Sequence, residues 1–289
     1  MKIGYLGPEA SFSHIATEKV FPKEELVAIG SIVKIFDMVE DGQIERAIVP
    51  IENSSGGSVA TTLNELLEKN LKIVGEYFSH INYCFLSKEN NSVKKIYSHA
   101  QGFLQCKDWI KKNYPNSELI ECSSNSKASE IASKENASAL STKDSAKVYG
   151  LKLIEETVND SKNNQTRFVV IGKKEEDSKG KEKTSCFFAL KDKPGALLDS
   201  LLPLKENSIN MTKIESRPSK ESAWEYVFFV EFEGNLEEER IKKALEEIKE
   251  HTTHIKLLGS YSKVWNLAGA FSFLVVKNPL FERFILNSK

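Results

Sequence analysis

The chain has 289 residues, of which 40% are hydrophobic and 28% charged, and its formal net charge is −1. This length usually divides into two or three domains, and the composition is typical of a folded globular protein and excludes wholesale disorder. A net charge near zero provides no basic surface for nucleic acid or an anionic membrane, so an anionic ligand must be held by local contacts.

The first half of the chain alternates apolar, β-branched runs with amphipathic stretches, which is the pattern of an α/β domain. Strands are predicted at residues 2–6, 26–29 and 46–51, and helices at residues 13–20, 32–39 and 59–67. A β-rich run at 72–86 leads into a second lobe, with strands at residues 94–98, 119–122, 137–140 and 153–157. One more strand, 168–172, is expected to return to the first sheet, and the two lobes then leave a ligand cleft between them.

The charged segment 173–183 reads as a linker to a second domain. Beyond it the order βαββαβ predicts a ferredoxin-like domain, with strands at 185–190, 210–216, 225–233 and 255–258 and helices at 196–205 and 237–250. The expected domains are residues 1–176, residues 184–262 and a tail, 263–289, to which no role is assigned. Within the first domain, lobe 1 is expected at about 1–77 and 165–176 and lobe 2 at about 78–164. The apolar part of the tail is shorter than a membrane-spanning helix, so no membrane anchor is expected.

Cysteine and histidine spacing does not suggest a metal site or a disulfide framework. The four cysteines are too scattered for a C-x-x-C motif, and His251 and His254 have no third zinc ligand nearby in the sequence. The first residues contain no signal-peptide-like apolar segment, so a cytoplasmic protein with reduced thiols is expected.

Four polar segments carry the strongest functional signal: GPEASFS at 7–13, VPIENSSGGSV at 49–59, SHAQGFLQC at 98–106 and NQTRF at 164–168. In this order and spacing they resemble the prephenate dehydratase family, and residues 195–197 and 215–218 are similar to the ACT domain of the same enzymes. The resemblance implies a two-lobed α/β fold like that of periplasmic binding proteins, followed by the ferredoxin-like ACT domain. Ala10 departs from the family, which usually has glycine there, and no chorismate mutase-like segment precedes the motifs, so a monofunctional enzyme is expected.

The implied activity is the loss of CO2 and hydroxide from prephenate to give phenylpyruvate. Because aromatisation supplies the driving force, no cofactor is required. The resemblance implies Thr166 as the catalytic hydroxyl, with Asn53, Ser98 and Gln105 as neutral donors to the substrate.

Arg167 and Phe168 complete the predicted substrate site. Arginine is scarce in this chain, with five against 35 lysines, which favours a local anion-binding role for Arg167. Arg167 is expected either to pair with a substrate carboxylate or to orient Thr166, and Phe168 either to line the site or to lie in the core. Strand alternation points Thr166 and Phe168 to one side and Arg167 to the other unless a bulge intervenes.

The ACT-like part is expected to bind phenylalanine between two ACT domains, which implies a homodimer or a homotetramer. By resemblance the effector site comprises Gly195, Ala196, Leu197, Asn210, Glu215, Ser216 and Arg217. Without the resemblance, Gly195 and Pro218 would be read as turn residues. Two alternative functions remain open: arogenate dehydratase, and a non-catalytic protein that senses an amino acid.

Overall fold

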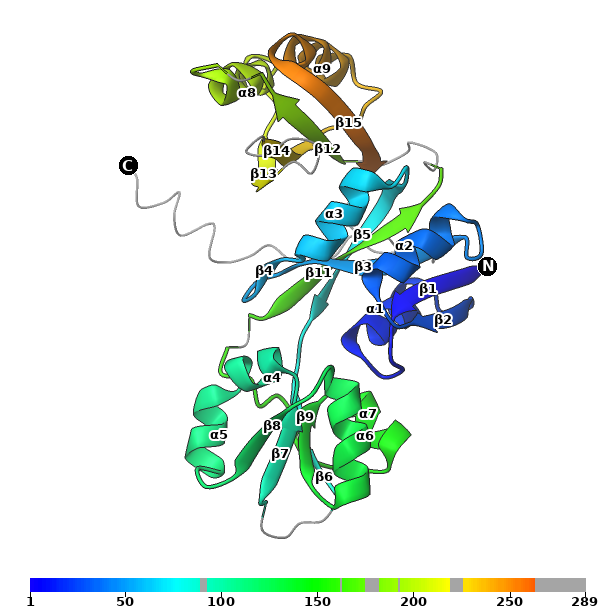
Figure 1. The fold of residues 1–289 in the computed structure, drawn as a ribbon, viewed down its shortest axis with the longest axis vertical. Coiled ribbons are helices and arrows are strands. Elements are labelled where there is room, and N and C mark those ends of the chain that lie inside the picture. Colours follow the sequence, from blue (N-terminus) through cyan, green and yellow to red (C-terminus); the bar gives the residue numbers. More distant parts are fainter. Residues whose placement is uncertain (89–92, 162, 175–181, 192, 219–225, 263–289) are drawn as a thin grey trace.

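A computed structural model describes residues 1–88, 93–161, 163–174, 182–191, 193–218 and 226–262 (Figure 1). Its three compact parts follow one another along the longest axis, with lobe 1 in the middle. The predicted tail and most of the predicted linker lie outside the described residues. None of the helices in the described ranges is long and apolar enough to cross a membrane.

Lobe 1 is built on a sheet in the order β2-β1-β3-β11-β5, with the short β4 paired to β3. Its strands are β1 (Lys2–Leu6), β2 (Glu25–Ile29), β3 (Arg46–Asn53), β4 (Gly57–Ser58), β5 (Lys72–His80) and β11 (Gln165–Gly172), and its helices are α1 (Phe12–Val20), α2 (Ile32–Glu40) and α3 (Ala60–Glu68). Strand β1 runs parallel to β2 and β3, whereas β11 lies antiparallel between β3 and β5. The predicted return of a late strand to the first sheet is therefore confirmed.

Lobe 2 has a second sheet in the order β10-β6-β9-β7-β8. Its strands are β6 (Cys84–Ser87), β7 (Lys95–Ser98), β8 (Glu118–Glu121), β9 (Ser138–Ser141) and β10 (Lys152–Glu155), and its helices are α4 (Ala100–Gln105), α5 (Lys107–Asn113), α6 (Asn125–Glu135) and α7 (Lys143–Tyr149). The β-rich run predicted at 72–86 is interrupted at residues 81–83, where the chain passes from one sheet to the other. The backbone N–H of Ile81 donates to the carbonyl of Asn164 at 2.9 Å. This bond joins the segment that leaves lobe 1 to the segment that returns to it just before β11.

The third part has the predicted βαββαβ order and an antiparallel sheet arranged β13-β14-β12-β15, which confirms the ferredoxin-like fold. Its elements are β12 (Lys183–Leu190), α8 (Ala196–Glu206), β13 (Met211–Pro218), β14 (Tyr226–Glu233), α9 (Glu239–His251) and β15 (Thr252–Tyr261). Strand alternation sends Phe188 into the core beneath the two helices and Phe187 to the opposite face.

That opposite face packs on lobe 1. Phe187, Phe229 and Tyr261 share one buried apolar cluster with Leu66 and Ile73 of lobe 1. Lysines then bond backbone carbonyls in both directions across the boundary: Lys72 to Leu257 at 2.7 Å, and Lys256 to Leu67 and Lys69 at 2.7 Å each. The sequence did not predict this packing, because an alternating strand does not reveal what will cover its second face.

Candidate active site

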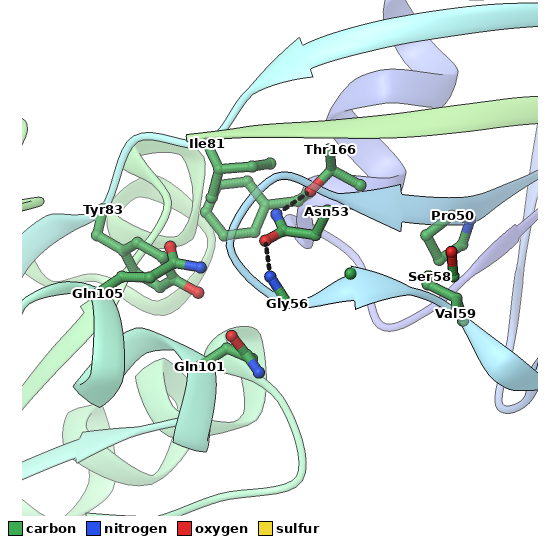
Figure 2. A pocket seen from close by; sticks show the side chains of 12 residues that line it. Pro50, Asn53, Gly56, Ser58, Val59, Ile81, Tyr83, Gln101, Gln105 and Thr166 are labelled. Carbon is green, nitrogen blue, oxygen red and sulfur yellow. Dashed lines mark hydrogen bonds between the residues drawn. The ribbon is translucent and has the colours of Figure 1, made fainter. Parts of the chain in front are cut away.

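A cavity of about 240 Å³ lies between the two lobes. Lobe 1 contributes the end of β3, the β4 turn, the start of α1 and Thr166 of β11, while lobe 2 contributes α4, and the crossing segment closes one side (Figure 2). The lining residues are Phe12, Pro50, Asn53, Gly56, Gly57, Ser58, Val59, Ile81, Tyr83, Gln101, Gln105 and Thr166. None of these is Asp, Glu, His, Lys or Arg, so the cavity offers hydrogen-bond donors and apolar walls rather than a titrating acid.

The Asn53 side chain has a fixed orientation at the centre of this cavity. Its Oδ1 accepts hydrogen bonds from the backbone N–H groups of Ser55 and Gly56, at 2.9 Å each. Because a backbone N–H can only donate, the oxygen must face the turn and the amide nitrogen must face β11. Asn53 is thereby locked with its Nδ2 pointing at Thr166.

Asn53 Nδ2 donates to Thr166 Oγ1 at 2.8 Å (Figure 2). The Thr166 oxygen is therefore an acceptor in this bond, and its own proton is free to be donated elsewhere. Thr166 lines the cavity, so a ligand oxygen placed there is a suitable acceptor. The pair thus presents a polarised hydroxyl donor.

The same network reaches the second lobe. Asn53 Nδ2 also approaches Asn164 Oδ1 at 3.0 Å, and Asn164 Nδ2 donates to Gln105 Oε1 of α4. Three of the predicted site residues, Thr166, Asn53 and Gln105, are therefore brought together around the cavity, although each is more than fifty residues from the next along the chain. Asn164, which bridges them, was within a quoted motif but was not predicted as a site residue.

The other three predicted substrate-binding residues, Ser98, Phe168 and Arg167, do not line the cavity. Ser98 is fully buried at the end of β7, and its hydroxyl bonds Asn125 Oδ1 at 3.1 Å. Asn125 in turn donates to the hydroxyl of Tyr83 at 3.1 Å, so Ser98 supports the cavity wall from behind. Phe168 is 1% exposed and belongs to the core of lobe 1, which corrects its prediction as a substrate contact.

Arg167 also lies outside the cavity, on the reverse face of β11. Its guanidinium bonds Glu76 at 2.7 Å and both oxygens of Glu231, in β14, at 2.6 Å each, and its side chain is 7% exposed. Burial raises the pKa of the Glu231 carboxyl, but the hydrogen bond and charge of Arg167 outweigh it and leave that pKa below the ordinary value. Arg167 therefore does bind anions, as predicted, but they are carboxylates of the protein itself. The prediction that it could contact the substrate is wrong.

Several lining residues were missed. Tyr83 is 2% exposed, and burial raises the pKa of its hydroxyl above the ordinary value, so it remains protonated. Gln101, at the start of α4, has a buried Oε1 without a hydrogen-bond partner. Gln101 lay within a quoted motif, but a glutamine on a short helix gives no sign in the sequence of the direction it faces.

The predicted effector residues divide into two groups. Gly195 adopts φ +81°, a left-handed conformation that favours glycine, directly before α8 with Ala196 and Leu197. On β13, Glu215 and Arg217 face lobe 1, where Glu215 accepts from Ser58 Oγ and Arg217 donates to Asn64 Oδ1 at 2.7 Å. Ser216 and Asn210 are exposed, Ser216 on the opposite side of β13.

No group of three or more metal-ligating side chains occurs among the residues whose placement is described.

Comparison with known proteins gives concordant results for both domains. A family model described as prephenate dehydratase matches residues 3–176, and an ACT domain model matches residues 184–250. The chain is 38% identical over 266 residues to a prephenate dehydratase of Methanocaldococcus jannaschii, covering 89% of this chain and 96% of that protein. It is 43% identical over 267 residues to a bifunctional chorismate mutase/prephenate dehydratase of Aquifex aeolicus, covering 91% and 74% respectively.

A solved prephenate dehydratase from Arthrobacter aurescens, in complex with L-Phe, has a TM-score of 0.84 at 25% identity and covers 91% of this chain and 90% of its own. Its likeness extends over both lobes and the ferredoxin-like part. Family models, relatives and fold agree, and the chain belongs to the prephenate dehydratase family.

Proposed function

We propose that this protein converts prephenate to phenylpyruvate, with Thr166 as the hydroxyl that assists the leaving group, and that phenylalanine regulates it through the ACT domain. Family membership supports the reaction, and the arrangement of the cavity supports the roles of the residues. In the reaction the bond between the ring and its carboxylate breaks to release CO2, and its electrons enter the ring. The C–O bond breaks at the opposite ring carbon, and the oxygen leaves as hydroxide, which solvent protonates.

One observation carries this proposal: Asn53 is held so that its amide donates to Thr166 Oγ1 at 2.8 Å. A threonine is a poor acid, so the site must act through preorganised hydrogen bonding rather than through proton transfer from a titrating group. Thr166 donates a hydrogen bond to the departing oxygen, on which the negative charge develops, and the bond from Asn53 polarises the Thr166 hydroxyl as a donor. The uncharged lining of the cavity supports this assignment.

Regulation by phenylalanine is supported by a direct contact between the two domains. Ser58 lines the cavity and donates to Glu215, one of the predicted effector residues. An effector that displaces β13 would therefore change the position of a cavity residue. We assign the phenylalanine site to the Gly195–Leu197 helix start and β13 at a contact between two ACT domains, in a homodimer or homotetramer in the cytoplasm.

The test of the assigned role replaces the Thr166 hydroxyl and keeps its shape. Thr166→Val is expected to abolish phenylpyruvate formation, followed by ultraviolet absorbance after prephenate addition, while Thr166→Ser retains measurable turnover. Circular dichroism and phenylalanine binding should be unchanged in both variants. Near-full turnover in Thr166→Val would refute the role of Thr166.

Two alternative functions are separated by the choice of substrate. Arogenate dehydratase performs the same chemistry on the transaminated compound, so the ratio of kcat/KM values for prephenate and arogenate decides between them. If wild-type protein binds prephenate and leaves it unchanged, the protein is a non-catalytic sensor.

A further inference from the structure

The two strands that carry Asn53 and Thr166 present a second pair of residues on their reverse face. In the register of β3 and β11, Thr166 lies opposite Asn53 and Arg167 lies opposite Glu52. Because side chains alternate along a strand, the first pair faces the cavity and the second faces away from it. Arg167 Nη1 and Glu52 Oε2 are 3.8 Å apart, so the second pair is also in contact.

Glu52 is bonded to the ACT domain. Lys213 Nζ, from β13, lies 2.8 Å from Glu52 Oε1 and 2.9 Å from the hydroxyl of Ser58. The Lys213 side chain is 13% exposed, so solvent weakens these contacts less than it weakens surface pairs. Ser58 pairs with Glu52 across the β3–β4 turn and lines the cavity. One lysine of the ACT domain therefore holds both the residue next to Asn53 and a cavity residue.

Arg167 is bonded to the same domain by a second group of contacts. Glu231 receives two hydrogen bonds from its guanidinium, and the hydroxyl of Tyr261 lies 3.2 Å from Nη2. Glu76 of β5 accepts from Arg167 and also pairs with Lys183, at 2.9 Å. The buried charges on the reverse face of the catalytic strands are thus neutralised in part by residues of the neighbouring domain, as burial of charge requires.

From these contacts we infer that Glu52 and Arg167 are positioning residues, and that Lys213 and Glu231 of the ACT domain complete the active site from behind. The ACT domain then fixes the Asn53–Thr166 geometry even when no effector is bound. This inference rests on the proposed function for its kinetic consequence, but its structural content is independent of the reaction. A displacement of about 1 Å at reacting groups is enough to reduce a rate on the order of a hundredfold.

The test compares two lysines of the same interface. Lys213→Met removes the bonds to Glu52 and Ser58, while Lys256→Met removes bonds to the carbonyls of Leu67 and Lys69, away from the cavity. We expect Lys213→Met to lower kcat about tenfold or more with KM changed less than about threefold, and Lys256→Met to keep kcat within about twofold. Arg167 is not the first choice for substitution, because removing one partner of a buried ion pair can prevent folding.

A second readout does not require catalysis. Hydrogen–deuterium exchange of the peptide covering residues 52–58 should accelerate in Lys213→Met and remain as in wild type in Lys256→Met. In the double variant Glu52→Gln/Lys213→Met, kcat should fall by less than the product of the two single-variant effects, because both substitutions break the Glu52–Lys213 contact.

Equal kcat values and equal exchange in the two lysine variants would overturn the inference, as would strictly additive effects in the double variant. If wild-type protein is inert with prephenate, the proposed function fails, and the exchange of residues 52–58 still decides whether Lys213 positions the turn.

Discussion

Replacing Asn53 with aspartate tests the direction of the hydrogen bond at Thr166. The two side chains have nearly the same shape, and a carboxylate oxygen can still accept from the N–H groups of Ser55 and Gly56. The second oxygen, however, replaces a donor located 2.8 Å from Thr166 Oγ1. Thr166 must then donate its proton to Asp rather than to the leaving oxygen.

Two effects of different size follow. Loss of one preorganised donor in an active site lowers kcat on the order of 10² to 10³-fold, or about 2.7–4 kcal/mol. At a separation of about 4 Å, the new negative charge and an anionic substrate would repel each other by about 1 kcal/mol in water and about 4 kcal/mol at an effective dielectric constant of 20. KM should therefore rise at least fivefold, and the increase should shrink with added salt.

Steady-state kinetics by ultraviolet detection of phenylpyruvate, at low and high salt, gives both constants. Asn163→Asp is the control, because this exposed residue lies beside Asn164 and its carbonyl, not its side chain, accepts from Ser54. The control should leave kcat within about twofold of wild type. If Asn53→Asp also retains wild-type kcat, whatever its KM, the reasoning about the Thr166 proton is wrong.

Three further predictions concern packing, pH and thiols. A Cβ at Gly102 would lie 2.1 Å from Ser98 Oγ and 2.9 Å from Tyr83, so Gly102→Ala should lower thermal stability and kcat, whereas Gly30→Ala, with open space, should change neither. Because the Glu231 pKa is lowered in the folded state, its stabilisation is complete above the unfolded pKa, about 4.3, and is lost as pH falls through the folded value. Urea denaturation should therefore show that the free energy of unfolding falls more between pH 6 and pH 3.5 for wild type than for Glu231→Gln. Burial raises the pKa of Cys186 to about 12, so native protein at pH 8 should resist thiol reagents that modify it after denaturation.

Strand and helix order could be predicted from the sequence because the hydrophobic period is a local property. The alternation along Thr166–Arg167 also correctly placed these two side chains on opposite faces of one strand. The residues that each face would contact could not be predicted from local sequence. Asn53 is 113 residues from Thr166, and Glu231, in another domain, is 64 residues from Arg167. For this reason the sequence predicted that Arg167 either pairs with the substrate or orients Thr166, and it did not predict the pairing of Arg167 with the neighbouring domain.

Burial was the second property that motifs did not reveal. Ser98 and Phe168 belong to the quoted segments, but their surroundings place one inside lobe 2 and the other inside lobe 1. Tyr83 and Ile81 line the cavity although no motif includes them, because they occupy the crossing between lobes. Only the folded arrangement of the two lobes shows that this connecting segment also lines the cavity.

The position of this crossing divides the cavity residues between the two lobes. Both Asn53 and Thr166 belong to lobe 1, while Gln101 and Gln105 belong to lobe 2. The hydrogen bond from Ile81 to Asn164 joins the two chain segments that cross between the lobes, beside the Asn53–Thr166 pair. Because both partners belong to lobe 1, the Asn53–Thr166 bond does not depend on how lobe 2 is placed. The donor pair is thus complete within one lobe, and only Gln101 and Gln105 are supplied to the cavity from the other.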